Sequence, residues 1–206
     1  LPGEHFAYRG YLNDPWFWTN PWWDYYNRQP YDIYCPLSVA RINAAGEVET
    51  AQQVDLLTCD TQRGEYLEDC ALEVVPHLRR ALKMRPDAPG ILTWVYPYEE
   101  YQQRTRSGPQ AQAEAFFSDL FVRCAITAGL PLNTVISTTD LMSAPRASLQ
   151  GTILLVPMPR EGDAWVERLL EWIAQGQQVI FYGPALGAER RVLDLLGLRL
   201  TEGIEG

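Results

Sequence analysis

Three carboxylates near the ends of expected strands are the residues of this chain best placed to do chemistry. Asp60 and Glu100 each follow a strand-like apolar segment, and Asp14 lies in a turn after a shorter one. Glycoside hydrolysis needs one carboxyl group as acid and a second as base or nucleophile, about 5–10 Å apart. Strand ends are where α/β folds place such groups. Acidic residues there also serve as helix caps or solvate loops, so both interpretations stay open for Asp14, Asp60 and Glu100.

A cluster of aromatic residues at the start of the chain is typical of sugar binding. Residues 1–34 contain half of all the aromatic residues, and turn-forming Asn and Pro residues separate four of them: Trp16, Trp18, Trp22 and Trp23. Sugars present apolar C–H faces on which such rings pack, while the indole N–H can bond a hydroxyl. We therefore expect a sugar platform on a loop. The alternative is that the rings fill a core or cover an interface, which is the better explanation for any single tryptophan.

Composition excludes several classes of partner. The net charge is −9 and no basic patch is visible, so we expect no nucleic-acid partner. No apolar run approaches the roughly 18 residues of a membrane span, which predicts no membrane insertion. The four cysteines show no C-x-x-C spacing and only two histidines accompany them, so we expect neither a metal site nor a cofactor. We expect the cysteines to be small buried side chains in a reducing compartment, which favours a cytoplasmic location; the alternative is that Cys59 and Cys70 pair in an exported parent protein. Because the chain begins without Met and stops directly after a strand-like segment, we interpret it as a piece of a longer protein.

The clearest structural pattern is a strand, a helix and a strand within residues 151–187. The apolar run 152–156 predicts a strand buried on both faces, and 178–182 predicts a second buried strand. Between them, a helical repeat over 164–175 begins after Asp163, the expected N-cap, and ends at Gly176. Such a unit requires parallel strands and a right-handed crossover.

The Pro- and Gly-rich segment 86–90 predicts a boundary between two domains, 1–88 and 89–206. The first is expected to contain a strand at 6–12, extended stretches 31–42 and 48–58 around a hairpin turn, and a helix over 71–85. The second adds strands 91–96 and 133–137, a polar loop 102–110, and helices over 112–128 and 189–196. An apolar stripe on the helix 112–128 predicts the face that packs on the sheet: Ala113, Phe116, Phe117, Leu120, Phe121, Cys124, Ala125 and Ala128.

The order of elements from residue 90 onward resembles a class I glutamine-amidotransferase-like domain. More narrowly, it is similar to the degenerate version that follows the catalytic barrel in β-galactosidases with a trimerisation domain. The resemblance rests on segment 154–157, the helix after it, segment 176–180 and the turn at Gly183. It implies the α/β class: a flavodoxin-like parallel sheet with helices on both faces, incomplete at its C-terminus. The segment before it is similar to the last part of such a barrel, or it forms an aromatic-rich α+β segment.

The chain departs from this family at its nucleophile. An active amidotransferase holds its cysteine between glycines in the turn after the strand equivalent to 178–182, where this sequence has Gly183, Pro184 and Ala185. Proline has neither a thiol nor a backbone N–H, so this turn offers no nucleophile and weakens any oxyanion hole. The departure predicts that the chain is not a glutaminase.

These observations favour a fragment of a carbohydrate-active, glycoside hydrolase-like protein. Paired carboxylates would hydrolyse glycosidic bonds without a cofactor, beside an inactive amidotransferase-like domain, and the full-length protein would be a homo-oligomer with carbohydrate as its partner. The alternative is a non-catalytic scaffold or oligomerisation domain in which the aromatic residues form an interface.

Overall fold

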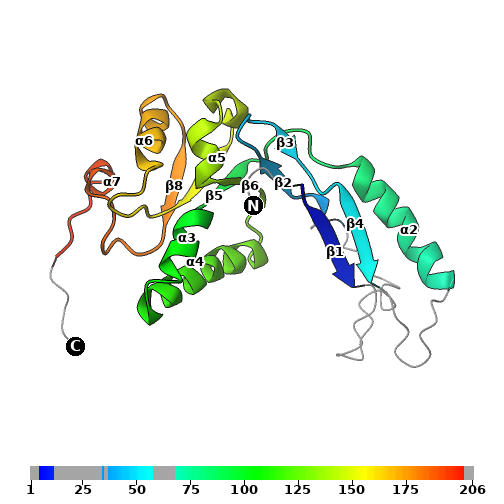
Figure 1. Cartoon of the computed structure of the whole chain (residues 1–206). Coiled ribbons are helices and arrows are strands. Elements are labelled where there is room, and N and C mark those ends of the chain that lie inside the picture. The colour runs from blue at the N-terminus through cyan, green and yellow to red at the C-terminus, as the bar shows by residue number, and fades with distance from the viewer. Residues whose placement is uncertain (1–4, 12–33, 35–36, 58–67, 202–206) are drawn as a thin grey trace. The chain divides into compact units, whose positions relative to one another are not determined.

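The structure is a computed structural model that describes residues 5–11, 34, 37–57 and 68–201 (Figure 1). The chain divides into two compact units. One, which we call the α/β unit, comprises Leu1–Gly3, Ile42–Glu47 and Pro89–Gly206. The other, the N-terminal unit, comprises Glu4–Arg41 and Val48–Ala88.

Four neighbouring parallel strands form the centre of the α/β unit. They are β5 (Leu92–Tyr96), β6 (Leu132–Ser137), β7 (Ile153–Pro157) and β8 (Val179–Tyr182), and they lie side by side in the order β6-β5-β7-β8. Leu155 of β7 pairs with Ile180 of β8 in parallel register, which confirms the predicted strand–helix–strand unit. The protein is thus of the mixed α/β class, with a mostly parallel sheet.

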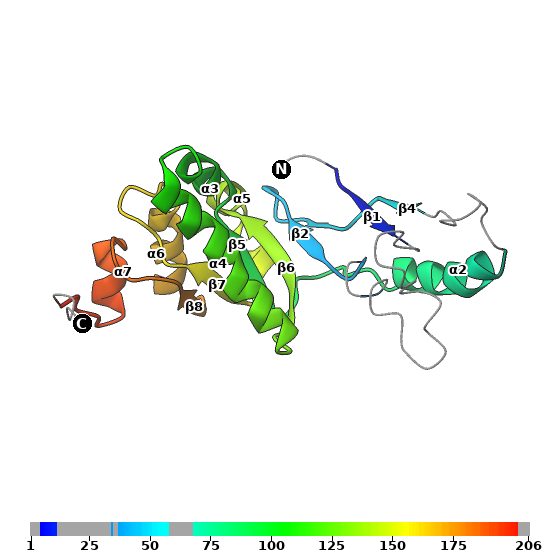
Figure 2. The ribbon, with the colours of Figure 1, turned by 90° about the horizontal axis from the view of Figure 1, so that it is seen from below.

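Helices cover this sheet. Figures 1 and 2 show α4 (Pro109–Thr127) on one side of the strands, with α5 (Thr138–Ser143) and α6 (Val166–Ala174) on the other. Two shorter elements are α3 (Tyr98–Arg104), between β5 and α4, and α7 (Arg190–Leu195), after β8; a 3-10 turn, η2, spans Arg146–Leu149. None of the described helices is long and apolar enough to cross a lipid bilayer.

The core of the α/β unit is centred on β7, in which every residue after Ile153 is buried. Leu155 packs with Val122 of α4 and with Tyr182, beside the half-buried Trp94. The prediction that β8 is also fully buried is wrong, because Ile180 is 47% exposed. In the described order β8 is the last strand, so it lacks the second neighbouring strand that shields β7.

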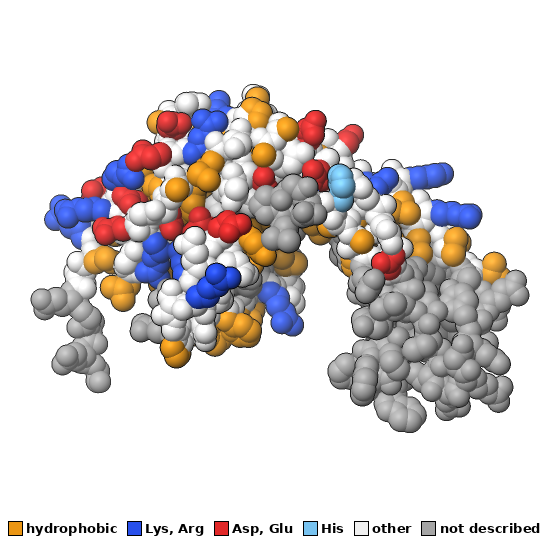
Figure 3. Space-filling view, in the orientation of Figure 1, with side chains coloured by type: hydrophobic (Ala, Val, Ile, Leu, Met, Phe, Trp, Pro, Cys, Tyr) orange, Lys and Arg blue, Asp and Glu red, His pale blue; other side chains and the backbone are white. Residues whose placement is uncertain are grey.

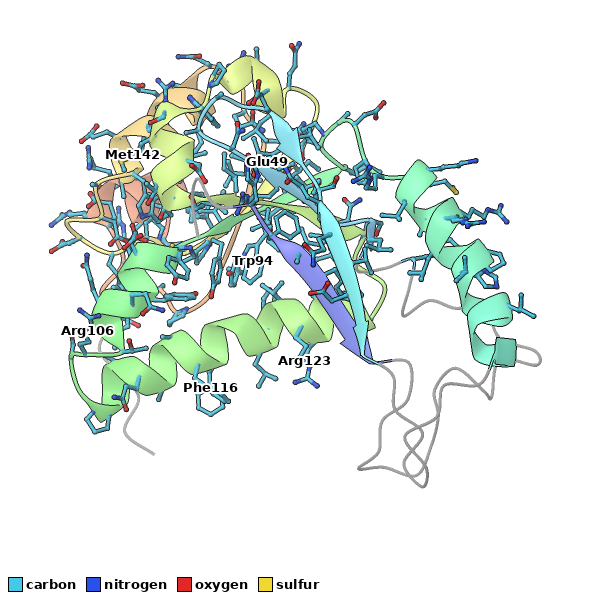
Figure 4. The ribbon with its side chains drawn as sticks, turned by 45° about the vertical axis from the view of Figure 1, so that its right-hand side comes forward. Glu49, Trp94, Arg106, Phe116, Arg123 and Met142 are labelled. Carbon is cyan, nitrogen blue, oxygen red and sulfur yellow. The ribbon has the colours of Figure 1, made fainter. Side chains whose placement is uncertain are left out.

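The helix α4 faces the sheet with a different side from the predicted one. Phe116 is 74% exposed, whereas Val122 is 1% exposed. In Figure 4, Phe116 and Arg123 point away from the strands, while Trp94 lies on the sheet side of the helix. The predicted stripe is therefore wrong for its large members, which are exposed: Phe116, Phe117, Leu120, Phe121 and Cys124. Ala115 and Val122, two helical turns apart, pack inward instead, and small side chains let the helix approach the sheet closely.

The N-terminal unit contains β1 (Ala7–Tyr11), which pairs in parallel with β4 (Gln53–Leu57). The helix α2 (Glu68–Lys83) begins earlier than predicted and continues across Pro76. The buried hydrophobic cluster of this unit consists of Leu37, Ala51 and Ala81. The predicted extended stretch 48–58 is wrong in detail, because its described part is divided into β3 (Val48–Glu49) and β4. Within the stretch 31–42, Ala40–Ile42 form a strand, β2, whereas the other described residues, 34 and 37–39, are not extended strand.

Candidate functional site: a pocket at the carboxyl ends of the strands

A cavity of about 400 Å³ opens at one edge of the sheet in the α/β unit. Its walls come from α3, α4 and the segments that follow β7 and β8. The lining residues are Tyr101, Arg104, Ala113, Phe117, Phe121, Pro157, Met158, Arg160, Tyr182, Gly183 and Pro184.

The strand order explains why a pocket forms here. The chain leaves β5 to build β6 on one side and later returns to build β7 on the other, so the connections after β5 and β7 diverge. In open α/β sheets, ligands bind in the crevice outside the carboxyl ends of the strands at such a point of divergence. The pocket uses residues that follow β5, β7 and β8, and it therefore occupies the position where this class of fold binds ligands.

Aromatic rings form one wall of the pocket. Tyr182 is 6% exposed and its ring stacks on that of Phe121, with centroids 5.1 Å apart and planes 14° apart. The indole Nε1 of Trp94 donates a hydrogen bond of 2.8 Å to the Tyr182 hydroxyl, which fixes the ring from behind. Phe117 and Phe121 are more than half exposed, so they form the rim of the pocket. The aromatic wall thus consists of a buried, hydrogen-bonded ring, Tyr182, and two exposed rings, Phe117 and Phe121.

Two arginines contribute the charge of the pocket. The Arg104 guanidinium lies 5.7 Å from the centroid of the Tyr101 ring, and its Nη2 lies 3.6 Å from Oδ2 of Asp163. The same carboxylate oxygen accepts a 2.8 Å hydrogen bond from the backbone N–H of Arg160. Asp163 was expected to cap the helix after it, which is wrong because the N-cap of α6 is Trp165. Its carboxylate instead holds the loop of Arg160 beside Arg104.

Glycine makes room for the second arginine. Nη1 of Arg160 donates a hydrogen bond to the carbonyl oxygen of Leu186. A Cβ atom on Gly187 would overlap this same Nη1, and the φ of Gly187 is +72°, in the left-handed region that favours glycine. Gly187, three residues after the lining residue Pro184, therefore leaves the space that the Arg160 guanidinium occupies.

The lining contains few of the groups that commonly perform catalysis. None of those eleven residues is Ser, Thr, Cys, His, Lys, Asp or Glu, so the lining offers no carboxylate pair, and its side-chain hydroxyl groups are those of Tyr101 and Tyr182. In the turn after β8 the pocket is lined by Gly183 and Pro184. Within the described parts of the chain, no group of three or more His, Cys, Asp or Glu residues is placed to hold a metal ion.

Of the residues selected from the sequence, Glu100 is the one that the structure describes. It lies in the first turn of α3, half-buried, and accepts a 2.8 Å hydrogen bond from Oγ1 of Thr138, at the start of α5. Next to it, the buried Asp140 accepts a 2.7 Å hydrogen bond from Ser137 Oγ. Glu100 is not among the residues that line the pocket. The other candidates lie outside the described residues: Asp14, Asp60, Trp16, Trp18, Trp22 and Trp23.

Sequence reasoning missed the two arginines of the pocket. Arg104 falls within the predicted polar loop 102–110, and Arg160 follows Pro159 in a segment for which the sequence pattern predicts neither a helix nor a strand. Their positions in the sequence could have indicated this site. Both arginines follow strands that were correctly predicted to be parallel, and residues that follow parallel strands lie at the same edge of the sheet.

Comparisons with known proteins give no further guidance, because no protein-family model, no curated protein and no solved structure matches this chain.

Proposed function

We propose that this chain is part of a carbohydrate-active, glycoside hydrolase-like protein, and that its α/β unit is a non-catalytic domain that binds a saccharide. The observation that carries the proposal is the pocket, in which aromatic side chains lie beside two guanidinium groups and no lining residue is a carboxylate. Sugar rings stack their C–H faces on aromatic side chains, and a few convergent polar groups fix their orientation. Its volume of about 400 Å³ lies within the range of small-molecule sites.

The fold of this domain is proposed to be flavodoxin-like and related to the class I amidotransferases. Numbered from its own first strand, the order β6-β5-β7-β8 reads 2-1-3-4, which agrees with the flavodoxin-like order. The turn of Gly183 and Pro184 at the pocket supports the further proposal that it has lost any glutaminase activity.

The N-terminal unit is proposed to be the end of a catalytic barrel. The parallel pairing of β1 with β4, followed by α2, supports this because a barrel of this kind alternates parallel strands with helices. Hydrolysis of a glycosidic bond would use the carboxylates of Asp14 and Asp60 in this unit, with no cofactor; Glu100 belongs to the α/β unit, where Thr138 donates a hydrogen bond to its carboxylate. The platform proposed for this activity consists of Trp16, Trp18, Trp22 and Trp23.

Saccharide binding by the pocket can be tested by titrating the full chain with oligosaccharides while following tryptophan fluorescence and, in parallel, heat release. Phe121→Ala removes a stacking face and should weaken binding by about 1–3 kcal/mol. Leu195→Ala is the control, because Leu195 is 53% exposed and does not line the pocket. Equal affinities for the folded Phe121→Ala variant and the parent would refute the proposal.

A second candidate function is an oligomerisation domain, which the exposed face of α4 favours. Phe116 and Phe117 pack edge to face, and Leu120 and Phe121 of the same helix are also exposed; Figure 3 shows apolar side chains along the lower edge of this unit. Exposed apolar patches of this kind are typical of protein interfaces. Phe116→Ser separates the two functions because Phe116 does not line the pocket. For an oligomerisation domain, light scattering should show a lower mass for this variant; an unchanged mass would exclude this face as the interface.

A further inference from the structure

We infer that the saccharide bound in this pocket carries an acetyl group, as an N-acetylated or O-acetylated sugar does. The inference rests on the proposed saccharide-binding function and specifies its ligand. An acetyl group combines a carbonyl oxygen, which accepts hydrogen bonds, with an apolar methyl group. The pocket has features that match both parts: the guanidinium group of Arg104, which can donate to the oxygen, and apolar side chains, which can surround the methyl group.

Arg104 retains hydrogen-bond donors for a ligand. A guanidinium group carries several N–H donors in a fixed plane. Nη2 of Arg104 lies 3.6 Å from Oδ2 of Asp163, which is an ion-pair distance but is longer than the roughly 3 Å of an N–H···O hydrogen bond. The same carboxylate oxygen accepts the 2.8 Å hydrogen bond from the backbone N–H of Arg160. Because the Arg104 side chain lines the cavity and is 22% exposed, an acceptor on the ligand can reach its N–H groups.

The charge of Arg104 already has a partner in Asp163, so a neutral acceptor suits this side chain. A hydrogen bond from a charged donor to a carbonyl oxygen is stronger than one between two neutral groups. The guanidinium is also held in place before any ligand arrives, by Asp163 and by the ring of Tyr101, whose centroid lies 5.7 Å away. A ligand that meets such a preorganised donor loses less free energy to ordering it.

Apolar side chains form a large part of the lining. Six of the eleven lining residues have purely apolar side chains: Ala113, Phe117, Phe121, Pro157, Met158 and Pro184. A methyl group that leaves water for such surroundings gains free energy, whereas a hydroxyl group there loses the hydrogen bonds that it made with water. These residues therefore favour an acetyl substituent over the hydroxyl group that it replaces. The exposed rings of Phe117 and Phe121 provide faces on which the sugar ring itself can stack.

The test compares disaccharides that differ in their acetyl groups, by calorimetry with the full chain at low and high salt. Diacetylchitobiose and cellobiose share one sugar skeleton and linkage, and differ by an acetamido group in place of a hydroxyl group on each ring. We expect diacetylchitobiose to bind about tenfold more tightly than cellobiose at both salt concentrations, since neither ligand is charged. An O-acetylated cellobiose, titrated in parallel, distinguishes an ester from an amide as the source of the acetyl group.

Variants of Arg104 test its role in the parent's preference for the acetylated ligand. Arg104→Met removes the N–H donors but retains a long unbranched side chain, and it should abolish most of this preference. Arg104→Lys retains the charge beside Asp163 with fewer donors, and we expect an intermediate preference. Arg106→Met is the matched control and should keep the full preference, since Arg106 is exposed on the segment between α3 and α4 and does not line the pocket.

The outcomes separate the inference from the proposed function. Equal binding of the acetylated and unacetylated disaccharides would overturn the acetylated ligand and leave the saccharide-binding function intact. Binding of none of them by the folded chain would overturn both. A preference for acetylated ligands that survives in folded Arg104→Met, or that disappears at high salt, would overturn the hydrogen bond on which the inference depends. If Arg104→Met fails to fold, Arg104→Lys decides: an undiminished preference in that variant would overturn the inference.

Discussion

The orientation of α4 gives the sharpest test of the structure, because the sequence pattern and the observed packing predict opposite results for two variants. Val122→Ala removes two methyl groups from a side chain that is 1% exposed and packs against Leu155 and Tyr182. At about 0.8 kcal/mol per buried methyl-sized group, with an added term for the cavity, the loss of folding free energy should be about 2–3 kcal/mol. Phe116→Ser, at a side chain that is 74% exposed, should change it by less than about 0.5 kcal/mol.

Urea unfolding of the full chain, followed by far-ultraviolet circular dichroism, measures both changes. The experiment should be run at low protein concentration, so that any association through the exposed face of α4 does not add to the apparent stability of the parent. A larger loss for Phe116→Ser than for Val122→Ala, at equal m-values, would falsify the observed orientation of the helix. It would also restore the stripe that the apolar pattern of the sequence predicts.

Three other perturbations have definite outcomes. Leu155→Asp should abolish the near-ultraviolet dichroism of the α/β unit, since an unpaired charge in a buried strand costs several kcal/mol; a variant that retains this signal would contradict the buried position. The hydrogen bond from Arg191 lowers the pKa of Glu189 below its ordinary 4.5, so its stabilisation is present at neutral pH and is lost as pH falls through the lowered pKa; the melting temperatures of Glu189→Gln and the parent should converge in acid, and a gap that widens there would refute this. Pro184→Cys should release no ammonia from glutamine above a buffer blank, because no lining residue is the His or carboxylate that a thiol nucleophile needs; measurable release would show that the pocket is catalytically competent.

The parallel strands of the α/β unit could be predicted because their signal is local. The apolar segments that became β5, β6, β7 and β8 lie between turn-forming residues, and the helix between β7 and β8 ends at Gly176, which has a φ of +88°. The short helices could not be predicted in the same way, since too few residues contribute to any periodic pattern. The helix α5, for example, begins where the side chain of Ser137 accepts a hydrogen bond from the backbone N–H of Asp140. A serine three residues before an aspartate does not by itself predict this contact.

The face of α4 could not be chosen from the sequence because the helix is apolar on more than one side. Its larger apolar residues form the stronger stripe in the sequence, but Ala115 and Val122 are the residues that are buried against the sheet, where their size allows close packing. The pocket was unpredictable for a related reason. Arg104 and Arg160 are far apart in the chain and neither lies in a motif, so only the order of the strands brings them to one cavity.

The pocket and the exposed face of α4 share residues, and this links the two proposed functions. Phe117 and Phe121 line the pocket and also belong to the apolar surface of the helix. A second copy that covered this surface would therefore change the rim that a saccharide contacts. By thermodynamic linkage, any effect of association on saccharide affinity must be matched by an equal effect of saccharide on association. Sedimentation of the full chain with and without a bound oligosaccharide measures the second effect. A shift in the association constant is expected if both functions use these two rings, and an unchanged constant would mean that they use separate surfaces.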